Sequence, residues 1–166
     1  MEASDAKGGG RDTPADFAAW VEPELSKMSR LAARLAPDAD RDDVVQEALV
    51  RAWRKRDQYD PGRGTAATWL LAITADQARR ARRRRRPYAL LGEISVPNRW
   101  PDDRVDVEAA VARLPTRQKL AVDCFYFVDL SVAETAAVMG CSEGTVKSTL
   151  SDARKRLRAL LEVTDG

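Results

Sequence analysis

The stretch from Leu130 to Leu160 constrains the fold more than any other part of the chain, because its pattern predicts two helices joined by a tight turn. Ser131 and Glu134 have the spacing of a capping box, in which a hydroxyl and a carboxylate satisfy backbone N–H groups at a helix start. Gly140 can supply the left-handed backbone that ends a helix, and Ser142 can cap a second helix. The pattern predicts a helix-turn-helix whose second helix enters a major groove of DNA. It also fits a plain helical hairpin, since capped amphipathic helices around a glycine occur in many bundles.

Helical periodicity continues through the rest of the chain, and no segment shows the alternation typical of a strand. We therefore predict an all-α fold of two small helical domains joined by a flexible linker, the C-terminal one containing the helix-turn-helix. Residues 1–13 are expected to form a disordered tail and residues 88–106 the linker. The two domains then occupy residues 14–87 and 107–166.

The first domain begins with apolar residues at helical spacing from Phe17 to Leu35, which predict one or two helices that end before Pro37. Asp40 or Asp42 can cap the next helix, which runs to Arg54. The apolar and polar positions of that helix fall on opposite faces, as expected for a helix packed on a core.

A loop is predicted over Gln58 to Gly64, which contains a proline and two glycines. Thr65 or Thr68 can open the following helix, and Pro87 is expected to stop it. This helix carries a tryptophan near its start and a run of arginines near its end. It therefore brings aromatic and cationic side chains into one element.

The composition is that of a globular protein, since 44% of the 166 residues are hydrophobic and can form a core. No run approaches the roughly 20 apolar residues that a membrane-spanning helix requires, and the first residues lack the apolar core of a signal peptide. We therefore expect a cytoplasmic protein.

Cys124 and Cys141 are the two cysteines of the chain, which has no histidine. This set fits neither a zinc site nor a disulfide framework, so we predict no metal and no cofactor. Both cysteines are expected to be small core residues, and a redox role is the less favoured alternative.

The net charge of only +2 argues against a dedicated nucleic-acid binder, but the charges are segregated along the chain. Acidic residues gather between Asp38 and Glu47 and again between Asp102 and Glu108. Arg79 to Arg86 is almost continuous arginine. Such segregation indicates different partners on different surfaces.

Three strings together resemble the bacterial extracytoplasmic-function (ECF) sigma factors of the sigma-70 family. The family's region 2.2 is similar to Asp42 to Arg54 (DDVVQEALVRAWR), and its regions 2.3 and 2.4 resemble Thr68 to Arg86. Its region 4 is similar to Ala112 to Leu161, where L-P-x-R-Q precedes the capped helix-turn-helix. The resemblance covers nearly all of the chain except the tail and the linker.

The resemblance implies a non-enzymatic subunit that binds core RNA polymerase, directs it to promoters and opens the start-site DNA. In the family, region 2.2 docks on a coiled coil of the polymerase. The face of this chain that matches it carries Asp43, Gln46, Glu47, Arg51 and Arg54. Without the resemblance, these residues would more simply form a solvated helix face.

Regions 2.3 and 2.4 of the family stabilise melted DNA at the −10 element, a task that needs planar side chains for bases and cations for the backbone. The candidates are Tyr59, Arg63, Trp69, Asp76, Arg79, Arg80 and Arg83. Trp69 fits a core position equally well, because it lies near an apolar stripe. Asp76 and Arg80 stand where the family usually has asparagine and aspartate, which leaves the base preference open.

Region 4 of the family reads the −35 element as duplex DNA, from base edges and phosphates. The candidates are Arg117, Ser142, Thr145, Lys147, Ser148, Ser151, Asp152, Arg154 and Lys155. Thr149, Ser151 and Asp152 stand where many relatives have basic residues, so readout of guanine by arginine is less available. For Asp152 we favour an ion pair with Lys155 or Arg156 over a contact to cytosine.

Two rival functions remain. A helix-turn-helix regulator that acts without core polymerase would explain the second domain but not the first. An enzyme, such as a serine recombinase with a similar DNA-reading module, is disfavoured because no serine, cysteine or lysine lies beside an activating base. The resemblance also allows for an anti-sigma protein as a partner, since many relatives have one.

Overall fold

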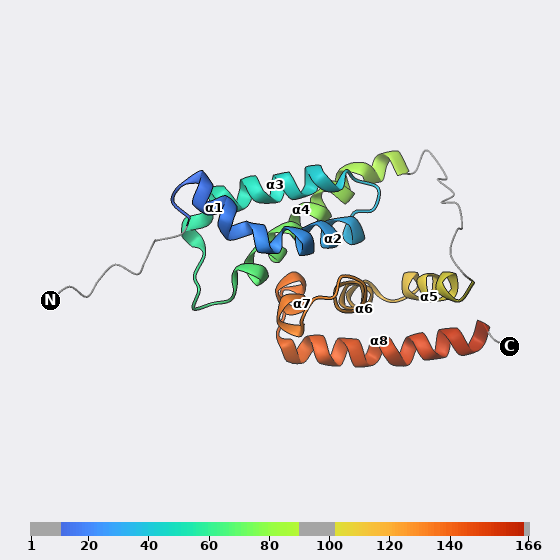
Figure 1. The fold of residues 1–166 in the computed structure, drawn as a ribbon. Helices are drawn as coiled ribbons and strands as arrows, with labels where there is room; N and C mark the ends of the chain where they lie inside the picture. The colour runs from blue at the N-terminus through green and yellow to red at the C-terminus, as the bar shows by residue number, and fades with distance from the viewer. Residues whose placement is uncertain (1–10, 90–101, 165–166) are drawn as a thin grey trace.

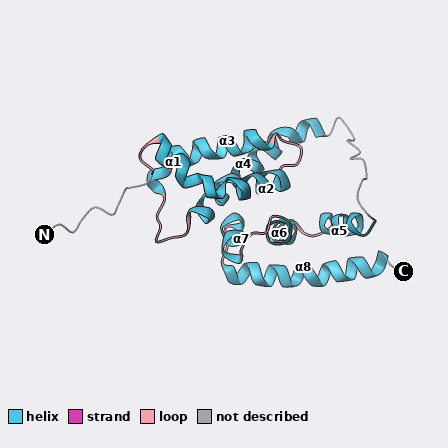
Figure 2. Cartoon of the chain, viewed as in Figure 1, coloured by secondary structure: helices cyan, strands magenta, loops and turns pink. Residues whose placement is uncertain are grey.

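The computed structural model describes residues 11–89 and 102–164, and within these ranges it is helical without strands (Figures 1 and 2). The chain forms two helical units, as predicted. The first unit comprises α1 (Pro14–Val21), the 3-10 turn η1 (Glu22–Glu24), α2 (Leu25–Leu35), α3 (Arg41–Arg54), the 3-10 turn η2 (Arg56–Gln58) and α4 (Ala66–Ala89). The second comprises α5 (Asp102–Ala112), α6 (Thr116–Val122), the π-helical turn η3 (Asp123–Phe127), α7 (Val132–Met139) and α8 (Glu143–Thr164).

Side-chain caps fix the helix starts of the first unit. Thr13 caps α1 through a hydrogen bond from the Asp16 amide, and Asp40 caps α3 by accepting from two backbone N–H groups. Of the two threonines predicted to open α4, Thr65 does so, since its hydroxyl accepts from the Thr68 amide at 3.2 Å. Helices α3 and α4 lie side by side, and both contact α2.

Three boundary predictions are wrong in detail. Helix α4 continues to Ala89, past Pro87. A proline after the first turn lacks the backbone donor and crowds the carbonyl four residues earlier, so α4 continues past Pro87 against the local preference. The predicted linker ends earlier than residue 106, because α5 begins at Asp102; residues 90–101 lie outside the described residues.

The predicted tail is also shorter than expected. Residues 1–10 lie outside the described part of the chain, but Arg11 and Thr13 have defined contacts. Arg11 stacks over the Tyr59 ring at 4.6 Å from its centroid, while Thr13 caps α1. The cation–π contact and the cap therefore extend the ordered unit to residue 11.

Two clusters of buried residues hold the fold together. The first fills the space between α1, α2, α3 and α4, with Met28, Leu31, Leu70 and Leu71 inaccessible to solvent, and it continues into the second unit. The second lies wholly within the second unit, around Val111, Val122, Val146, Leu150 and Ala153. Among the described helices, none is long and apolar enough to cross a bilayer.

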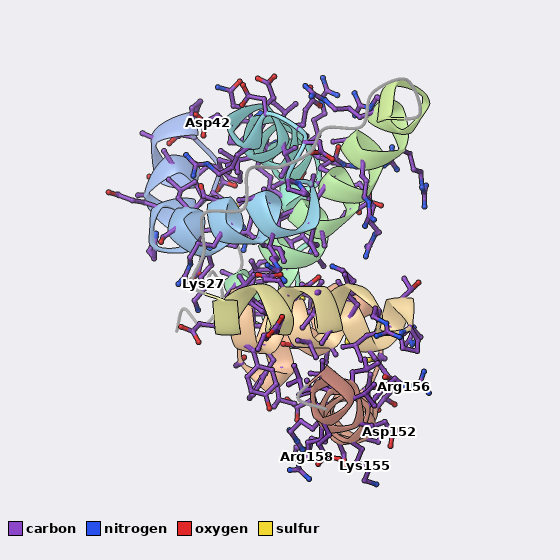
Figure 3. All side chains as sticks on the ribbon, turned by 90° about the vertical axis from the view of Figure 1, so that its right-hand side faces the viewer. Lys27, Asp42, Asp152, Lys155, Arg156 and Arg158 are labelled. Atoms are coloured by element: carbon purple, nitrogen blue, oxygen red, sulfur yellow. The ribbon has the colours of Figure 1, made fainter. Side chains whose placement is uncertain are left out.

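The two units contact each other directly. In Figure 1, α7 lies below α4, in agreement with the close backbone approach of these two helices, and η3 approaches α2. Figure 3 shows Lys27 at this boundary, whereas Asp42 lies on the opposite side of the first unit and Asp152 on the opposite side of the second. The contact thus leaves the outer faces of α3 and α8 open.

Candidate nucleic-acid interface

The helix-turn-helix forms as the sequence predicts. The Ser131 hydroxyl accepts from the Glu134 amide at 3.0 Å, and the Ser131 amide donates to the Glu134 carboxylate at 2.9 Å. Gly140 ends α7 in the left-handed conformation, with φ of 66°. The Thr145 amide donates to the Ser142 hydroxyl at 3.2 Å, which caps α8. These bonds fix the direction in which α8 leaves the turn.

Helix α8 has one buried face and one polar face. Its buried face carries Val146, Leu150 and Ala153, all within the second core. Of the residues predicted to contact the −35 element, all are exposed except Ser151, which is half-buried: Arg117, Ser142, Thr145, Lys147, Ser148, Asp152, Arg154 and Lys155. Figure 3 shows Asp152, Lys155 and Arg158 on the side of α8 that faces away from the first unit, with Arg156 at its flank.

Some polar groups of these residues already form hydrogen bonds within the protein. The Ser148 hydroxyl donates to the carbonyl of Thr145 at 3.0 Å, and Arg154 donates to the Tyr126 hydroxyl at 3.0 Å. Lys147 and Lys155 form no ion pair among the described residues, so their ammonium groups are available to phosphates.

The expected ion pair of Asp152 is absent. No carboxylate–cation distance within 4.0 Å joins it to Lys155 or Arg156, so that prediction is wrong for the described structure. An exposed pair gains little Coulomb energy in water and costs side-chain entropy, which explains why helical spacing alone did not produce it. Asp152 therefore remains available on the outer face of α8.

An aromatic cluster lies where α4 begins. Trp69 is half-buried and packs against the first core, with ring centroids 5.6 Å from Tyr59 and 5.9 Å from Trp20. Tyr59 also donates to the carbonyl of Gly64 at 3.2 Å, which holds the loop between α3 and α4. Trp69 thus has a packing role, and its half-exposed ring still leaves a surface for stacking.

Sequence reasoning missed two members of this cluster. Trp20 belongs to the apolar stripe from Phe17 to Leu35, but its ring also contacts those of both Tyr59 and Trp69. Arg11 fell in the predicted tail, although it stacks on Trp20 and Tyr59. No local pattern could reveal these contacts, because residues far apart in the sequence make them.

The arginines of α4 form an exposed basic surface at Arg79, Arg80, Arg82, Arg83, Arg84 and Arg85. Arg80 pairs with Asp76 at 3.1 Å, so the two residues that depart from the family's pattern neutralise each other. Arg79 donates a long hydrogen bond of 3.5 Å to the carbonyl of Val138 in α7. Arg63 projects from the loop, with a side chain that is 90% exposed.

The outer face of α3 carries the residues predicted to contact the polymerase. Asp43, Gln46, Glu47 and Arg54 are exposed and Arg51 is half-buried, while Val44, Val45, Ala48 and Ala52 on the opposite face are buried. Asp43 and Glu47 also line an open hollow of about 240 Å³ whose other wall includes Arg84 and Arg85 of α4. A mixed-charge surface of this kind suits a protein partner.

Neither cysteine forms a disulfide, and Cys124 is buried as predicted, while Cys141 is half-buried. Burial raises the pKa of the Cys124 thiol to about 12, with the neighbouring Asp123 acting in the same direction. The thiolate is the reactive form of cysteine, so Cys124 is unreactive in this environment. Among the described residues, no group of acidic or cysteine side chains could hold a metal ion.

Two family models match the chain, one over each unit. The family model for sigma-70 region 2 matches residues 18–88, and that for sigma-70 region 4 matches residues 104–157. The chain is 34% identical to the ECF RNA polymerase sigma factor SigM of Mycobacterium tuberculosis, over 83% of this chain and 71% of that protein. It is 36% identical to the ECF sigma factor EcfG of Rhodopseudomonas palustris, over 84% of this chain and 81% of that protein.

Two solved structures are similar over most of the chain. CnrH in complex with the cytosolic domain of CnrY has a TM-score of 0.66 and 27% identity, covering 92% of this chain and 91% of that one. The sigma factor RpoE in complex with the anti-sigma factor NepR from Bartonella quintana has a TM-score of 0.63 and 28% identity, covering 89% of this chain and 98% of that one. Both likenesses extend over the two helical units.

Proposed function

The chain belongs to the ECF sigma factors of the sigma-70 family, and from this premise we propose that it binds core RNA polymerase and directs promoter-specific transcription initiation. The observation that carries this proposal is the presence of regions 2 and 4 in one chain, each on its own helical unit. A helix-turn-helix regulator that acts alone would have no use for the match over residues 18–88. That alternative is therefore not favoured.

We infer that the first unit, from α1 to α4, acts as the region 2 domain and the second unit, from α5 to α8, as the region 4 domain. In the second, α8 would read the −35 element as duplex DNA. Lys147, Ser148, Ser151 and Asp152 would face base edges, and Asp152 without an ion pair would be free to accept from cytosine. Arg117, Ser142, Thr145, Arg154 and Lys155 would contact phosphates, together with the amides at the start of α8.

In the first domain, the start of α4 would stabilise melted DNA at the −10 element. The half-exposed rings of Tyr59 and Trp69 support stacking, which contributes about 1–3 kcal/mol per base. Arg63, Arg79, Arg80 and Arg83 would hold the backbone. The Asp76–Arg80 pair would be broken or shared when DNA binds, so these two residues would influence base preference.

The outer face of α3 would dock on core polymerase through Asp43, Gln46, Glu47, Arg51 and Arg54. Its exposure beside a buried opposite face supports this assignment. The chain would act in the cytoplasm, where RNA polymerase works, and would perform no catalysis, because the polymerase supplies the chemistry. An anti-sigma factor is the further partner that its relatives suggest.

Run-off transcription with purified core polymerase on a genomic fragment library tests the proposal. We expect transcripts from a subset of promoters that core polymerase alone does not start. If the protein adds no transcript to those of core polymerase, the proposal fails. Tight, melting-independent binding to promoter DNA without core polymerase would instead favour the solitary regulator.

The −35 assignment predicts that Lys147→Ala weakens duplex binding and reduces the slope of log affinity against log salt, because the duplex loses a contact to a cation. Arg158→Ala is the matched control, because Arg158 is an exposed cation of the same helix that is outside the assigned set. Equal effects of the two substitutions would show that α8 contributes only general positive charge.

The core-docking assignment predicts that Asp43→Lys with Glu47→Lys abolishes co-purification with core polymerase, because like charges would meet across the interface. Asp38→Lys with Asp57→Lys changes the net charge equally at exposed positions outside the α3 face. Circular dichroism should show both double variants folded. Retention of the Asp43/Glu47 variant by core polymerase would contradict the assignment.

A further inference from the structure

Arg11 lies on an aromatic cluster that three separate elements build. Trp20 comes from α1, Tyr59 follows η2, and Trp69 lies in the first turn of α4. All three rings are half-buried, so each leaves part of its surface to solvent. The guanidinium carbon of Arg11 is 4.6 Å from the centroid of Tyr59 and 5.2 Å from that of Trp20. At these distances the faces of the rings attract the cation.

Local structure holds both partners of this contact in place. On one side, the Thr13 hydroxyl caps α1 at 3.2 Å from a backbone amide, and Pro14 occupies the first turn of that helix. The cap and the fixed φ of the proline set the direction in which the chain enters α1. On the other side, the Tyr59 hydroxyl donates to the carbonyl of Gly64 at 3.2 Å. Arg11 is therefore positioned before any ligand binds, which lowers the entropic cost of binding.

Arg11 differs from the two other arginines that stack on rings in the described part of the chain. Arg34 lies over Phe127, and its N–H groups bind carboxylates of the second unit. Arg56 lies over Trp53 and donates to a backbone carbonyl at 2.9 Å. Arg11 has no carboxylate within 4.0 Å among residues 11–89 and 102–164. Its fork of N–H donors therefore remains available to an anion, and this fork matches the oxygens of a phosphate.

The combination of a cation and partly exposed rings suits single-stranded DNA. Each nucleotide of a melted strand presents a phosphate and an unpaired base, which bind cations and aromatic faces. A duplex keeps its bases stacked inside, so it would offer the rings no base. Arg63, whose side chain is 90% exposed, supplies another cation from the loop that follows Tyr59. Arg11 itself lies before residues 18–88, the part of the chain that the region 2 model matches, so that match assigns it no role.

From these observations we propose that Arg11 is a further DNA-binding residue: held on the Tyr59 ring, its guanidinium binds a phosphate of the melted strand next to a base that contacts the aromatic cluster. The rings supply the surface for the base and Arg11 supplies the charge for the backbone. The role of Arg11 at a promoter rests on the proposed function, whereas its capacity to bind single-stranded DNA does not.

Binding of forked promoter DNA to preassembled holoenzyme tests the role at a promoter. The fork is duplex at the −35 element and single-stranded at the −10 element. Arg11→Gln should raise its Kd about tenfold, because a phosphate loses a charged hydrogen-bond donor. Arg41→Gln is the matched control and should stay within twofold: Arg41 is an exposed arginine at the start of α3, and the whole helix, about 21 Å long at 1.5 Å per residue, separates it from Tyr59. An unchanged Kd for Arg11→Gln, or an equal loss for Arg41→Gln, would overturn the proposal.

The dependence of that Kd on salt separates a phosphate contact from a merely structural role. Arg11→Gln should reduce the slope of log affinity against log salt, because a cation no longer meets the backbone. Arg11→Lys keeps the charge and should keep the slope of the wild type, although an ammonium group lacks the planar fork and should recover only part of the affinity. If Arg11→Gln loses affinity but keeps the slope of the wild type, Arg11 acts only by holding Tyr59, and the phosphate assignment is overturned.

Nuclear magnetic resonance of the free protein tests the site without the polymerase. A short single-stranded oligonucleotide, titrated at low salt, should shift the Nε–H signal of Arg11 and leave that of Arg41 unchanged. A duplex of the same sequence should shift the Arg11 signal less. No shift, or an equal shift with the duplex, would overturn the assignment to a melted strand. If the wild-type holoenzyme binds no promoter at all, the proposed function fails instead, and this titration still decides whether Arg11 binds single-stranded DNA.

Discussion

The two helical units bury their apolar residues in different ways. The core of the second unit is complete within that unit, around Val146, Leu150 and Ala153 of α8. The core of the first unit continues across the boundary and includes Val128 and Val138 of the second. If the units separated, the core around α8 would stay packed, but apolar surface would be exposed on both units, on α2 and α4 of the first and at Val128 and Val138 of the second.

This difference affects the free energy that separation of the two units would cost. Exposed apolar surface costs about 25 cal/mol per Å² in water, so separation is favoured only when something else covers the exposed face or offsets that cost. A partner that binds the first unit would remove part of the cost. The second unit would also lose cover at Val128 and Val138, whereas its core around Val146, Leu150 and Ala153 would not.

A matched pair of core substitutions tests the difference most strongly. Leu31→Ala, in the shared core, and Leu150→Ala, in the second core, should each lower the free energy of unfolding by about 2–5 kcal/mol, since both remove buried methylene groups. Hydrogen exchange should distinguish them. Leu31→Ala should speed exchange in both units, and Leu150→Ala mainly in residues 132–164. Identical exchange patterns would show that the two cores act as one.

A smaller effect is expected at the turn of the helix-turn-helix. Gly140→Ala should lower the free energy of unfolding by about 1–2 kcal/mol, because an L-residue is disfavoured at φ of 66°. A Cβ there would meet no atom within 4 Å, so backbone strain is the only cost. Gly144→Ala in α8 is the control and should be neutral or stabilising in denaturant unfolding. A cost as large for Gly144→Ala would contradict this account.

The smallest expected effect is that of the Lys27–Glu134 ion pair on the free energy of unfolding. It is measured as a change of stability with pH. Burial alone would raise the pKa of the Glu134 carboxyl, but its hydrogen bonds from Lys27 and Ser131 lower it below the ordinary value. The hydrogen bond with Glu134 raises the pKa of Lys27. The pair therefore contributes stability between about pH 4.3 and 10.4.

That contribution should fall as the pH drops through the lowered pKa of Glu134, and again as the pH rises through the raised pKa of Lys27. Because Lys27 is about one-third exposed, solvent limits it to about 1 kcal/mol or less. Thermal melting of the wild type and of Lys27→Met across pH 3 to 7 tests the loss of this contribution at low pH. The difference between the two proteins should shrink toward pH 3, and a constant difference would contradict this assignment.

Local signals predicted most of the fold. The Ser131–Glu134 capping box, the left-handed Gly140 and the Asp40 cap are all formed, because each depends on residues within four positions of one another. Prediction failed at Pro87, where the cost of a proline inside a helix was overestimated. It also failed at Asp152, where an exposed ion pair gains little free energy. The ion pairs between the two units have no local signal in the sequence, since the Arg34–Asp123 bond joins residues 89 positions apart. Sequence periodicity carries no information about such a contact.

The candidate site was also predicted only in part. The exposed faces of α3 and α8 follow directly from amphipathic spacing, and the family resemblance assigned roles to them. The place of Trp20 in the aromatic cluster and the pairing of Asp76 with Arg80 required the folded chain. The DNA and polymerase contacts of individual residues stay predictions.

Glu134 makes two bonds with its two oxygens: one caps α7 through the Ser131 amide, and the other pairs with Lys27 of α2. The start of the DNA-reading motif and the surface of the first unit are therefore thermodynamically linked. A ligand that changes the geometry around Glu134 from the DNA side must alter the affinity of a ligand that acts on Lys27, and the second must alter the first by the same factor. If promoter DNA acts on the first of these surfaces and a partner on the second, the coupling between the two binding events must be equal in both directions.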